Sequence, residues 1–118
     1  MNLVILTGRL AQDPDIRMSR DGQTMIATYT LAVDTGKDTE ADYYDCKCFN
    51  KSAQFVEKYL RKGTKIAVTG SLSTERWNDK ESGRPRRAIK INVRQHEFCE
   101  AKKQESTWQE PQEELPFN

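Results

Sequence analysis

The chain of 118 residues has little of what catalysis and disulfide bonding require. It contains one His and three Cys, and it has neither a nucleophile motif nor a glycine loop that would cradle a phosphate. An odd number of Cys without a signal-peptide pattern argues against a disulfide framework. No apolar run approaches the ~18 residues of a membrane span. These absences predict a cytoplasmic protein that is not an enzyme and uses no cofactor.

Charge is distributed unevenly along the chain, although the formal net charge is only +1. Residues 1–99 contain 17 Lys and Arg against 13 Asp and Glu, whereas residues 100–118 contain 2 against 5. A mildly basic body with an acidic tail suits a polyanion-binding domain whose tail meets other proteins. The alternative is ordinary surface charge with a solvated end. The Lys, Gln, Glu, Ser and Pro of the last residues cannot bury a core, so we predict a domain over residues 1–99 and a disordered acidic tail over 100–118.

Alternating hydrophobicity predicts strands. In residues 65–78, Ile66, Val68 and Leu72 share one parity with Gly70 while most of the other positions are polar, which is typical of a half-buried strand. Residues 86–98 alternate likewise, with the inward positions Ile89, Ile91 and Val93.

Three earlier stretches are also predicted strands. Residues 3–10 are apolar at nearly every position, which predicts burial of both faces, against the core or against another subunit. Gly8 would let a neighbouring backbone approach closely or the strand bend. Residues 16–18 and 24–33 form a predicted hairpin, in which Ile26 departs from the alternation. The third stretch is residues 43–49, where Cys46 and Cys48 share one face.

One stretch, residues 52–60, has helical spacing. Asn50 or Ser52 would cap its start and Gly63 would end it. Its apolar stripe is formed by Phe55, Val56, Tyr59 and Leu60. The predicted order is three strands, a helix and two strands. We therefore predict an all-β chain: a five-stranded OB-fold barrel with one short helix between strands 3 and 4.

Three aromatic residues fall on the polar parity of the predicted strands. Tyr43 and Phe49 share a parity with Asp45 and Lys47, and Trp77 follows Arg76 at an odd position of its strand. A bulge could return Trp77 to the core; otherwise its ring is offered to a flat ligand. Bases stacked on such rings gain about 1–3 kcal/mol each, whatever the base.

Basic residues are interleaved with these rings. An OB-fold binds with its middle strands and with the loops joining strands 1–2 and 4–5, which is where Tyr43, Phe49 and Trp77 fall. Each basic residue alone is equally well explained as solvated surface charge. The candidate phosphate-binding residues are Arg9, Lys51, Lys62, Lys65, Arg76, Arg84, Arg86 and Arg87.

A zinc site is the main competing interpretation. Cys46, Cys48, His96 and Cys99 form a tetrahedral ligand set by residue type. However, a Cys-x-Cys pair on one strand face more often fills a core, and His96 and Cys99 have opposite strand parity. We therefore predict no metal site.

Five segments together carry a family resemblance: MNLVILTGRL at residues 1–10, DPDIR at 13–17, TLAV at 30–33, YLRKG at 59–63 and GSLST at 70–74. Over residues 1 to about 98 the chain resembles the bacterial and phage-type single-stranded DNA-binding proteins. The resemblance implies sequence-independent binding of single-stranded DNA, with Tyr43, Phe49 and Trp77 stacking on bases. It also implies a homotetramer, a role in DNA replication, recombination and repair, and a nucleoid-associated location in the cytoplasm.

The C-terminal tip resembles the acidic tip with which family members dock on replication, recombination and repair proteins. The residues implied to bind such partners are Glu113, Glu114, Leu115, Pro116 and Phe117. Asn118 departs from the family, which usually ends in Phe, and implies altered docking. The acidic loop 34–42 implies less extensive DNA wrapping. Glu75, where relatives often have a basic residue, should repel phosphate.

Other interpretations stay open at this point. The barrel could serve RNA binding or primosome assembly, and a preference for RNA over DNA would reveal the 2′-hydroxyl contacts of such a module. A zinc-stabilised structural module is the third interpretation. The sequence does not decide between a chromosomal and a phage or mobile-element origin.

Overall fold

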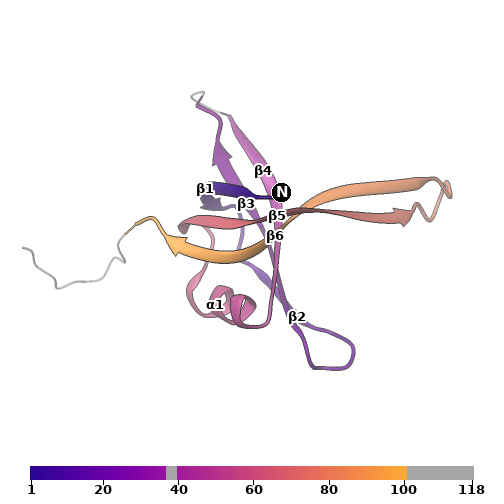
Figure 1. The fold of residues 1–118 in the computed structure, drawn as a ribbon, viewed down its shortest axis with the longest axis horizontal. Coiled ribbons are helices and arrows are strands. Elements are labelled where there is room, and N and C mark those ends of the chain that lie inside the picture. Colours follow the sequence, from indigo (N-terminus) through magenta and orange to yellow (C-terminus); the bar gives the residue numbers. More distant parts are fainter. Residues whose placement is uncertain (37–39, 101–118) are drawn as a thin grey trace, which may run out of the picture.

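The computed structural model describes residues 1–36 and 40–100. Its elements are β1 (Val4–Leu10), β2 (Asp15–Met18), β3 (Met25–Asp34), β4 (Ala41–Phe49), α1 (Lys51–Tyr59), β5 (Lys65–Asn78) and β6 (Pro85–Phe98). Figure 1 shows α1 below β5 and β6, and in the chain it lies between β4 and β5. The predicted OB-fold order is confirmed, and so is the predicted hairpin, in which the short strand β2 pairs with β3 in antiparallel orientation.

The sheet closes into a barrel, which pairs edges that would otherwise be open. The strand order is β1-β5-β6-β4-β3-β2, and β1 also pairs with β3. β4 and β6 run parallel, with Cys46 opposite Ile91. A Cβ on Gly8 would overlap the carbonyl oxygen of Ala32, so the predicted close backbone approach at Gly8 is confirmed where β1 meets β3.

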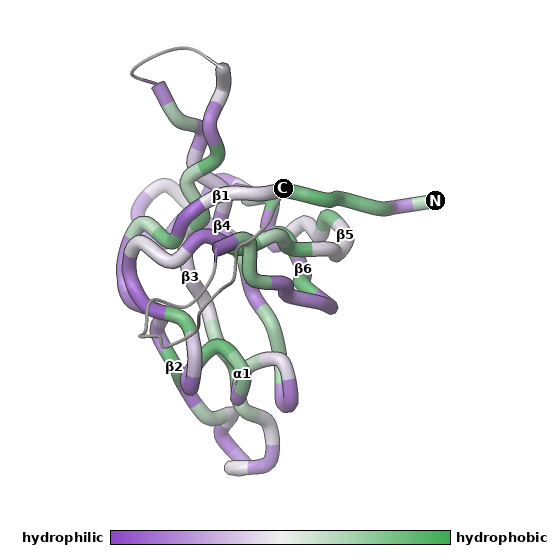
Figure 2. Tube along the Cα trace, turned by 90° about the vertical axis from the view of Figure 1, so that its left-hand side faces the viewer, coloured by the Kyte–Doolittle hydropathy of each residue, from purple (hydrophilic) through white to green (hydrophobic). Residues whose placement is uncertain are grey.

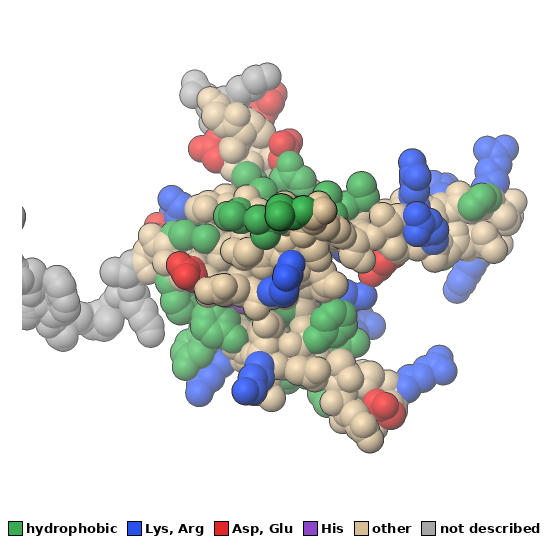
Figure 3. All heavy atoms as spheres, in the orientation of Figure 1, with side chains coloured by type: hydrophobic (Ala, Val, Ile, Leu, Met, Phe, Trp, Pro, Cys, Tyr) green, Lys and Arg blue, Asp and Glu red, His purple; other side chains and the backbone are tan. Residues whose placement is uncertain are grey.

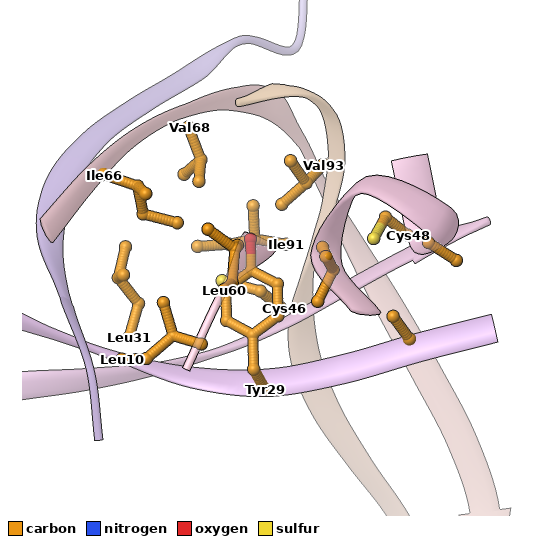
Figure 4. Close-up of a cluster of buried hydrophobic side chains, with 13 residues drawn as sticks. Leu10, Tyr29, Leu31, Cys46, Cys48, Leu60, Ile66, Val68, Ile91 and Val93 are labelled. Atoms are coloured by element: carbon orange, nitrogen blue, oxygen red, sulfur yellow. The ribbon is translucent and has the colours of Figure 1, made fainter. Parts of the chain in front are cut away.

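The core is built from one parity of each strand together with two positions of α1 and its end. Figure 4 shows Ile66 and Val68 facing Ile91 and Val93 inside the ring of strands, with Tyr29 below them. Cys46 and Cys48 are fully buried, so their predicted role as small core residues is confirmed. The alternation predicted for β3 is also confirmed, and Ile26 lies on the opposite face from its core.

Helix α1 begins and ends one residue earlier than predicted. Val56 and Leu60 are buried, but Tyr59 is exposed, so the predicted apolar stripe is wrong at Tyr59. The predicted side-chain cap is also wrong: Asn50 Oδ1 accepts the backbone N–H of Met25 at 3.2 Å instead, and Ser52 Oγ donates to the carbonyl of Arg94. Both residues tie the helix start to neighbouring strands. In the ranges that the structure describes, no helix is long and apolar enough to cross a membrane.

Beyond the barrel, β5 and β6 continue together as a hairpin arm, defined here as residues 72–90 (Figure 1). Leu72 and Ile89 are exposed, so the prediction that they face the core is wrong. Their alternation is real, but at these positions the two strands have already left the barrel. The pairing slips between Thr69 and Gly70, which leaves Arg94 of β6 as the extra residue.

Strand β1 is buried on one face rather than two. Val4 and Leu6 pack against the core, but Leu3 and Ile5 are exposed. The prediction of burial on both faces is therefore wrong within a single chain. Figure 2 shows this hydrophobic start of β1 running outward from the body of the barrel.

Candidate nucleic-acid interface

At one end of the outer barrel face, cross-strand pairing places side chains from four strands in a row. Directly opposed residues of antiparallel strands point to the same side of the sheet. Tyr43 is opposite Ala32, Ala32 is opposite Arg9, and Arg9 is opposite Lys65. The small side chain of Ala32 leaves room between the ring of Tyr43, which is 65% exposed, and the guanidinium of Arg9. An aromatic ring and two cations therefore share this row.

A second row lies at the other end of β4. Phe49 is opposite Ile26, and Ile26 is opposite Arg17. Phe49 is 38% exposed, and the Lys47 ammonium lies 5.9 Å from its ring centroid. The six steps from Tyr43 to Phe49 span about 20 Å at the rise of a strand. The two rings thus mark the ends of a face long enough for several nucleotides.

Residues that the sequence did not single out line this second row. A pocket of about 380 Å³ lies beside it. Its lining includes Arg17, Met18 and Ile26. The departure of Ile26 from the alternation of its strand was the feature that could have placed it on the outer face. Lys51, a predicted phosphate-binding residue, begins α1 two positions after Phe49.

Between the two rows the outer face carries charges of both signs. A pocket of about 350 Å³, the central pocket, lies between β4 and the base of the hairpin arm. Across it Lys47 Nζ donates to Glu75 Oε2 at 2.9 Å, and Lys90 Nζ donates to Asp45 Oδ2 at 3.4 Å. The lysines nearest the middle of β4 are therefore already paired with carboxylates.

The hairpin arm presents the third predicted ring. Trp77 is 50% exposed and lies opposite Arg86, while Arg76 lies opposite Arg87. A pocket of about 410 Å³ runs between Trp77 and these arginines. The extra residue of the bulge is on β6, so the alternation of β5 continues past it and the bulge alternative for Trp77 is wrong.

Arginine dominates the charge of the arm. Asp79 Oδ2 accepts a hydrogen bond from Arg86 Nη2 at 3.2 Å. Two hydrogen bonds to the Asp79 carboxyl lower its pKa: the larger effect comes from the backbone N–H of Glu81 and the smaller from the Arg86 guanidinium. Within the described residues, Arg76, Arg84 and Arg87 form no ion pair. Figure 3 shows the resulting gathering of Lys and Arg side chains over the arm.

The remaining basic candidates are Arg9 and Lys65, which share the row of Tyr43, and Lys62. Arg9 donates to the carbonyl of Gly63 at 2.9 Å and to Glu100 Oε2 at 2.7 Å, and the bond to Glu100 raises the pKa of Arg9. The backbone N–H of Lys62 donates to Asp13 Oδ1 at 2.8 Å. The structure thus places predicted basic residues in the row of Tyr43, close after Phe49 and along the arm, and Lys62 beside Asp13.

The proposed zinc ligands do not converge in the structure. Burial raises the pKa of the Cys46 and Cys48 thiols to about 12, as expected for small residues that fill a core. His96 Nε2 lies 2.8 Å from the hydroxyl of Tyr29, and Cys99 is exposed. Among the described residues, no three His, Cys, Asp or Glu side chains form a group that could hold a metal ion.

The aromatic surroundings of His96 explain its protonation state. Its ring stacks on Phe55 with centroids 5.4 Å apart, and burial lowers its pKa to about 4. His96 is therefore neutral and structural. The predicted partner-binding residues, Glu113 to Phe117, lie outside the described residues.

Comparisons with known proteins point to one family. A family model described as "Single-strand binding protein family" matches residues 1–99. The chain is 34% identical over 104 residues to the single-stranded DNA-binding protein of Thermosynechococcus vestitus, covering 87% of this chain and 86% of that protein. It is 33% identical over 96 residues to single-stranded DNA-binding protein 1 of Synechocystis sp., covering 79% and 78%. A solved structure described as Plasmodium falciparum SSB complex with ssDNA matches with a TM-score of 0.70 and 26% identity, over 85% of this chain and 96% of that one.

Proposed function

Since the chain belongs to the single-strand binding protein family, we propose that it binds single-stranded DNA without sequence preference. The observation that carries the proposal is the exposure of three aromatic rings, those of Tyr43, Phe49 and Trp77, on outer strand faces. Exposed rings contribute little to the core. The exposed part of each ring is surface on which a base of any identity can stack.

Phosphate neutralisation supplies the rest of the affinity. The arginines of the arm flank Trp77, and Arg9 and Lys65 share the row of Tyr43. A strand that stacks on the three rings therefore passes basic side chains at both ends of its path. Contacts of this kind release counterions from the DNA, so binding weakens steeply as salt is added.

We propose further that the chain acts as a homo-oligomer, most simply a tetramer. Leu3, directly before β1, and Ile5 within it are both exposed, and a strand with such an apolar outer face is suited to pairing with another copy. An oligomer of such barrels would present one DNA-binding face per copy and would hold a long DNA strand at many points.

The wider role that we propose is protection of exposed strands during DNA replication, recombination and repair, in the cytoplasm at the nucleoid. Partner proteins would be recruited through Glu113, Glu114, Leu115, Pro116 and Phe117. The support is the acidic sequence of residues 100–118, which contains five Glu and two Lys, beside a more basic domain. Acidic segments of this composition bind basic surfaces of other proteins.

The test is a fluorescence titration of the Trp108→Phe protein with a thymine oligonucleotide at several salt concentrations. Trp77 is then the only tryptophan, and stacking should quench its emission. The affinity should fall with a slope of roughly −0.7 per phosphate contacted. Absence of binding at low salt would refute the proposal. A parallel titration with the matched RNA tests the alternative, since tighter binding of RNA would indicate contacts to the 2′-hydroxyl.

A further inference from the structure

The central pocket has an unusual charge for a surface that contacts a polyanion. Its lining contains four carboxylates and two ammonium groups, from Asp13, Asp15, Asp45, Glu75, Lys47 and Lys90. The arm and the Tyr43 row are basic, so this acidic stretch interrupts the path that a strand would take between them. Phosphates are repelled where acids outnumber cations.

The two lysines of the central pocket are held in ion pairs that cross between elements. Lys47 of β4 reaches Glu75 of β5 at 2.9 Å, and Lys90 of β6 reaches Asp45 of β4 at 3.4 Å. Their side chains keep only 33% and 29% of their surface exposed, against 77% for Arg17 in its pair with Asp15. Their carboxylate partners are more open, with 40% of the Glu75 side chain and 55% of the Asp45 side chain exposed, so added salt weakens both pairs in part.

We propose that Glu75 and Asp45 limit the affinity of this interface for DNA, a proposal that rests on the function proposed above. Their carboxylates form ion pairs with the ammonium groups of Lys47 and Lys90. These ammonium groups lie in the central pocket, between β4, which carries Tyr43 and Phe49, and the base of the arm. A phosphate that reached either lysine would have to displace a carboxylate already in place. The middle of the path is therefore internally neutralised. Phosphate contacts come from cations that form no ion pair within the described residues: Arg76, Arg84 and Arg87 of the arm and Lys65 at the other end.

The same pairs could instead serve only to fix the arm against the barrel. The two roles predict opposite effects on DNA binding. If the carboxylates occupy lysines that would bind phosphate, neutralising them strengthens binding and adds phosphate contacts. If they only hold the arm in place, neutralising them loosens the arm, moves Trp77 relative to the other rings and weakens binding.

The experiment compares Glu75→Gln and Asp45→Asn, which keep side-chain shape, with Glu57→Gln as the matched control. Glu57 is exposed on α1, so this control changes the net charge equally but away from the pocket. Each pocket variant should bind a thymine oligonucleotide about three- to tenfold more tightly at low salt. Each should also steepen the salt slope by about 0.7, as expected for one more phosphate contact. The control should change neither quantity by as much.

Lys47→Met completes a double-mutant cycle with Glu75→Gln. In the unaltered protein Lys47→Met leaves Glu75 without its cation and should lower the affinity; in the Glu75→Gln protein it should abolish the gain. Binding by the pocket variants that equals the control, or is weaker, would overturn the inference while leaving DNA binding itself intact. Failure of every variant and of the unaltered protein to bind DNA would instead refute the proposed function.

Discussion

Replacement of Trp77 by Ala tests whether a ring on the outer face serves a ligand rather than the fold. The side chain is half exposed. A Trp offers about 150–250 Å² of surface, so roughly 100 Å² is free to be covered by a base. At about 25 cal/mol per Å² this area corresponds to ~2.5 kcal/mol, within the range of about 1–3 kcal/mol for stacking of one base. The expected rise in Kd is about 5- to 150-fold.

The same substitution should cost the fold little. Trp77 lies on the arm, outside the core cluster, and its buried half packs on elements that can loosen locally without unfolding the barrel. We expect a loss of no more than about 1 kcal/mol in the free energy of unfolding, against about 3–5 kcal/mol for an aromatic residue removed from a core.

The assay is polarisation of a labelled thymine oligonucleotide at several salt concentrations, with urea unfolding followed by circular dichroism. The salt slope should stay unchanged, because the ring contacts no phosphate. Trp77→Phe is the control: it keeps an aromatic face and should lose less affinity than Trp77→Ala. A Kd within twofold of the unaltered protein, or a loss of stability of core size, would refute the assignment of Trp77 to the interface.

Four further predictions concern the core, the register shift at Gly70, the oligomer and the tail. The unfolded pKa of His96 is near 6.5 and its folded pKa is about 4; stability is therefore fully present above pH 6.5 and falls by about 3 kcal/mol towards pH 4. His96→Gln, which keeps an acceptor for Tyr29, should remove that part of the pH dependence in urea unfolding, and an unchanged profile would contradict it. Gly70→Ala places a Cβ against the carbonyl of Asn92 and should cost about 2–3 kcal/mol, whereas Ser71→Ala should cost much less. Ile5→Glu should reduce the mass measured by light scattering to a smaller assembly, and an unchanged mass would exclude the outer side of β1 as the interface. Deletion of residues 113–118 should leave DNA affinity unchanged and abolish capture of replication and repair proteins; equal capture would remove the tail from that role.

The sequence predicted the parts of the fold that depend on local alternation. The buried parity of β3 and the outer positions of Tyr43, Phe49 and Trp77 follow from a period of two, which each strand imposes without reference to its neighbours. The same rule was wrong for Leu72 and Ile89, because alternation does not reveal where a strand leaves the barrel. The prediction that Leu3 and Ile5 are buried was wrong for a related reason, since apolar residues on a strand face do not reveal whether other residues of the same chain cover that face.

The sequence did not predict side-chain contacts between residues of different elements. Glu75 was expected to repel phosphate, but its partner Lys47 lies 28 positions away on a strand that is not its neighbour in the sheet. The two come within hydrogen-bond distance because β4 and β5 flank β6 in the sheet, an order that the sequence does not reveal. Asn50 shows a related effect, because its side chain binds Met25 of the neighbouring strand β3 rather than the helix that it begins. The consequence for binding is specific: Lys47 was not among the predicted phosphate-binding residues, and in the structure its ammonium group is paired with Glu75. An interface of this kind can lower its affinity for DNA without losing a single basic residue.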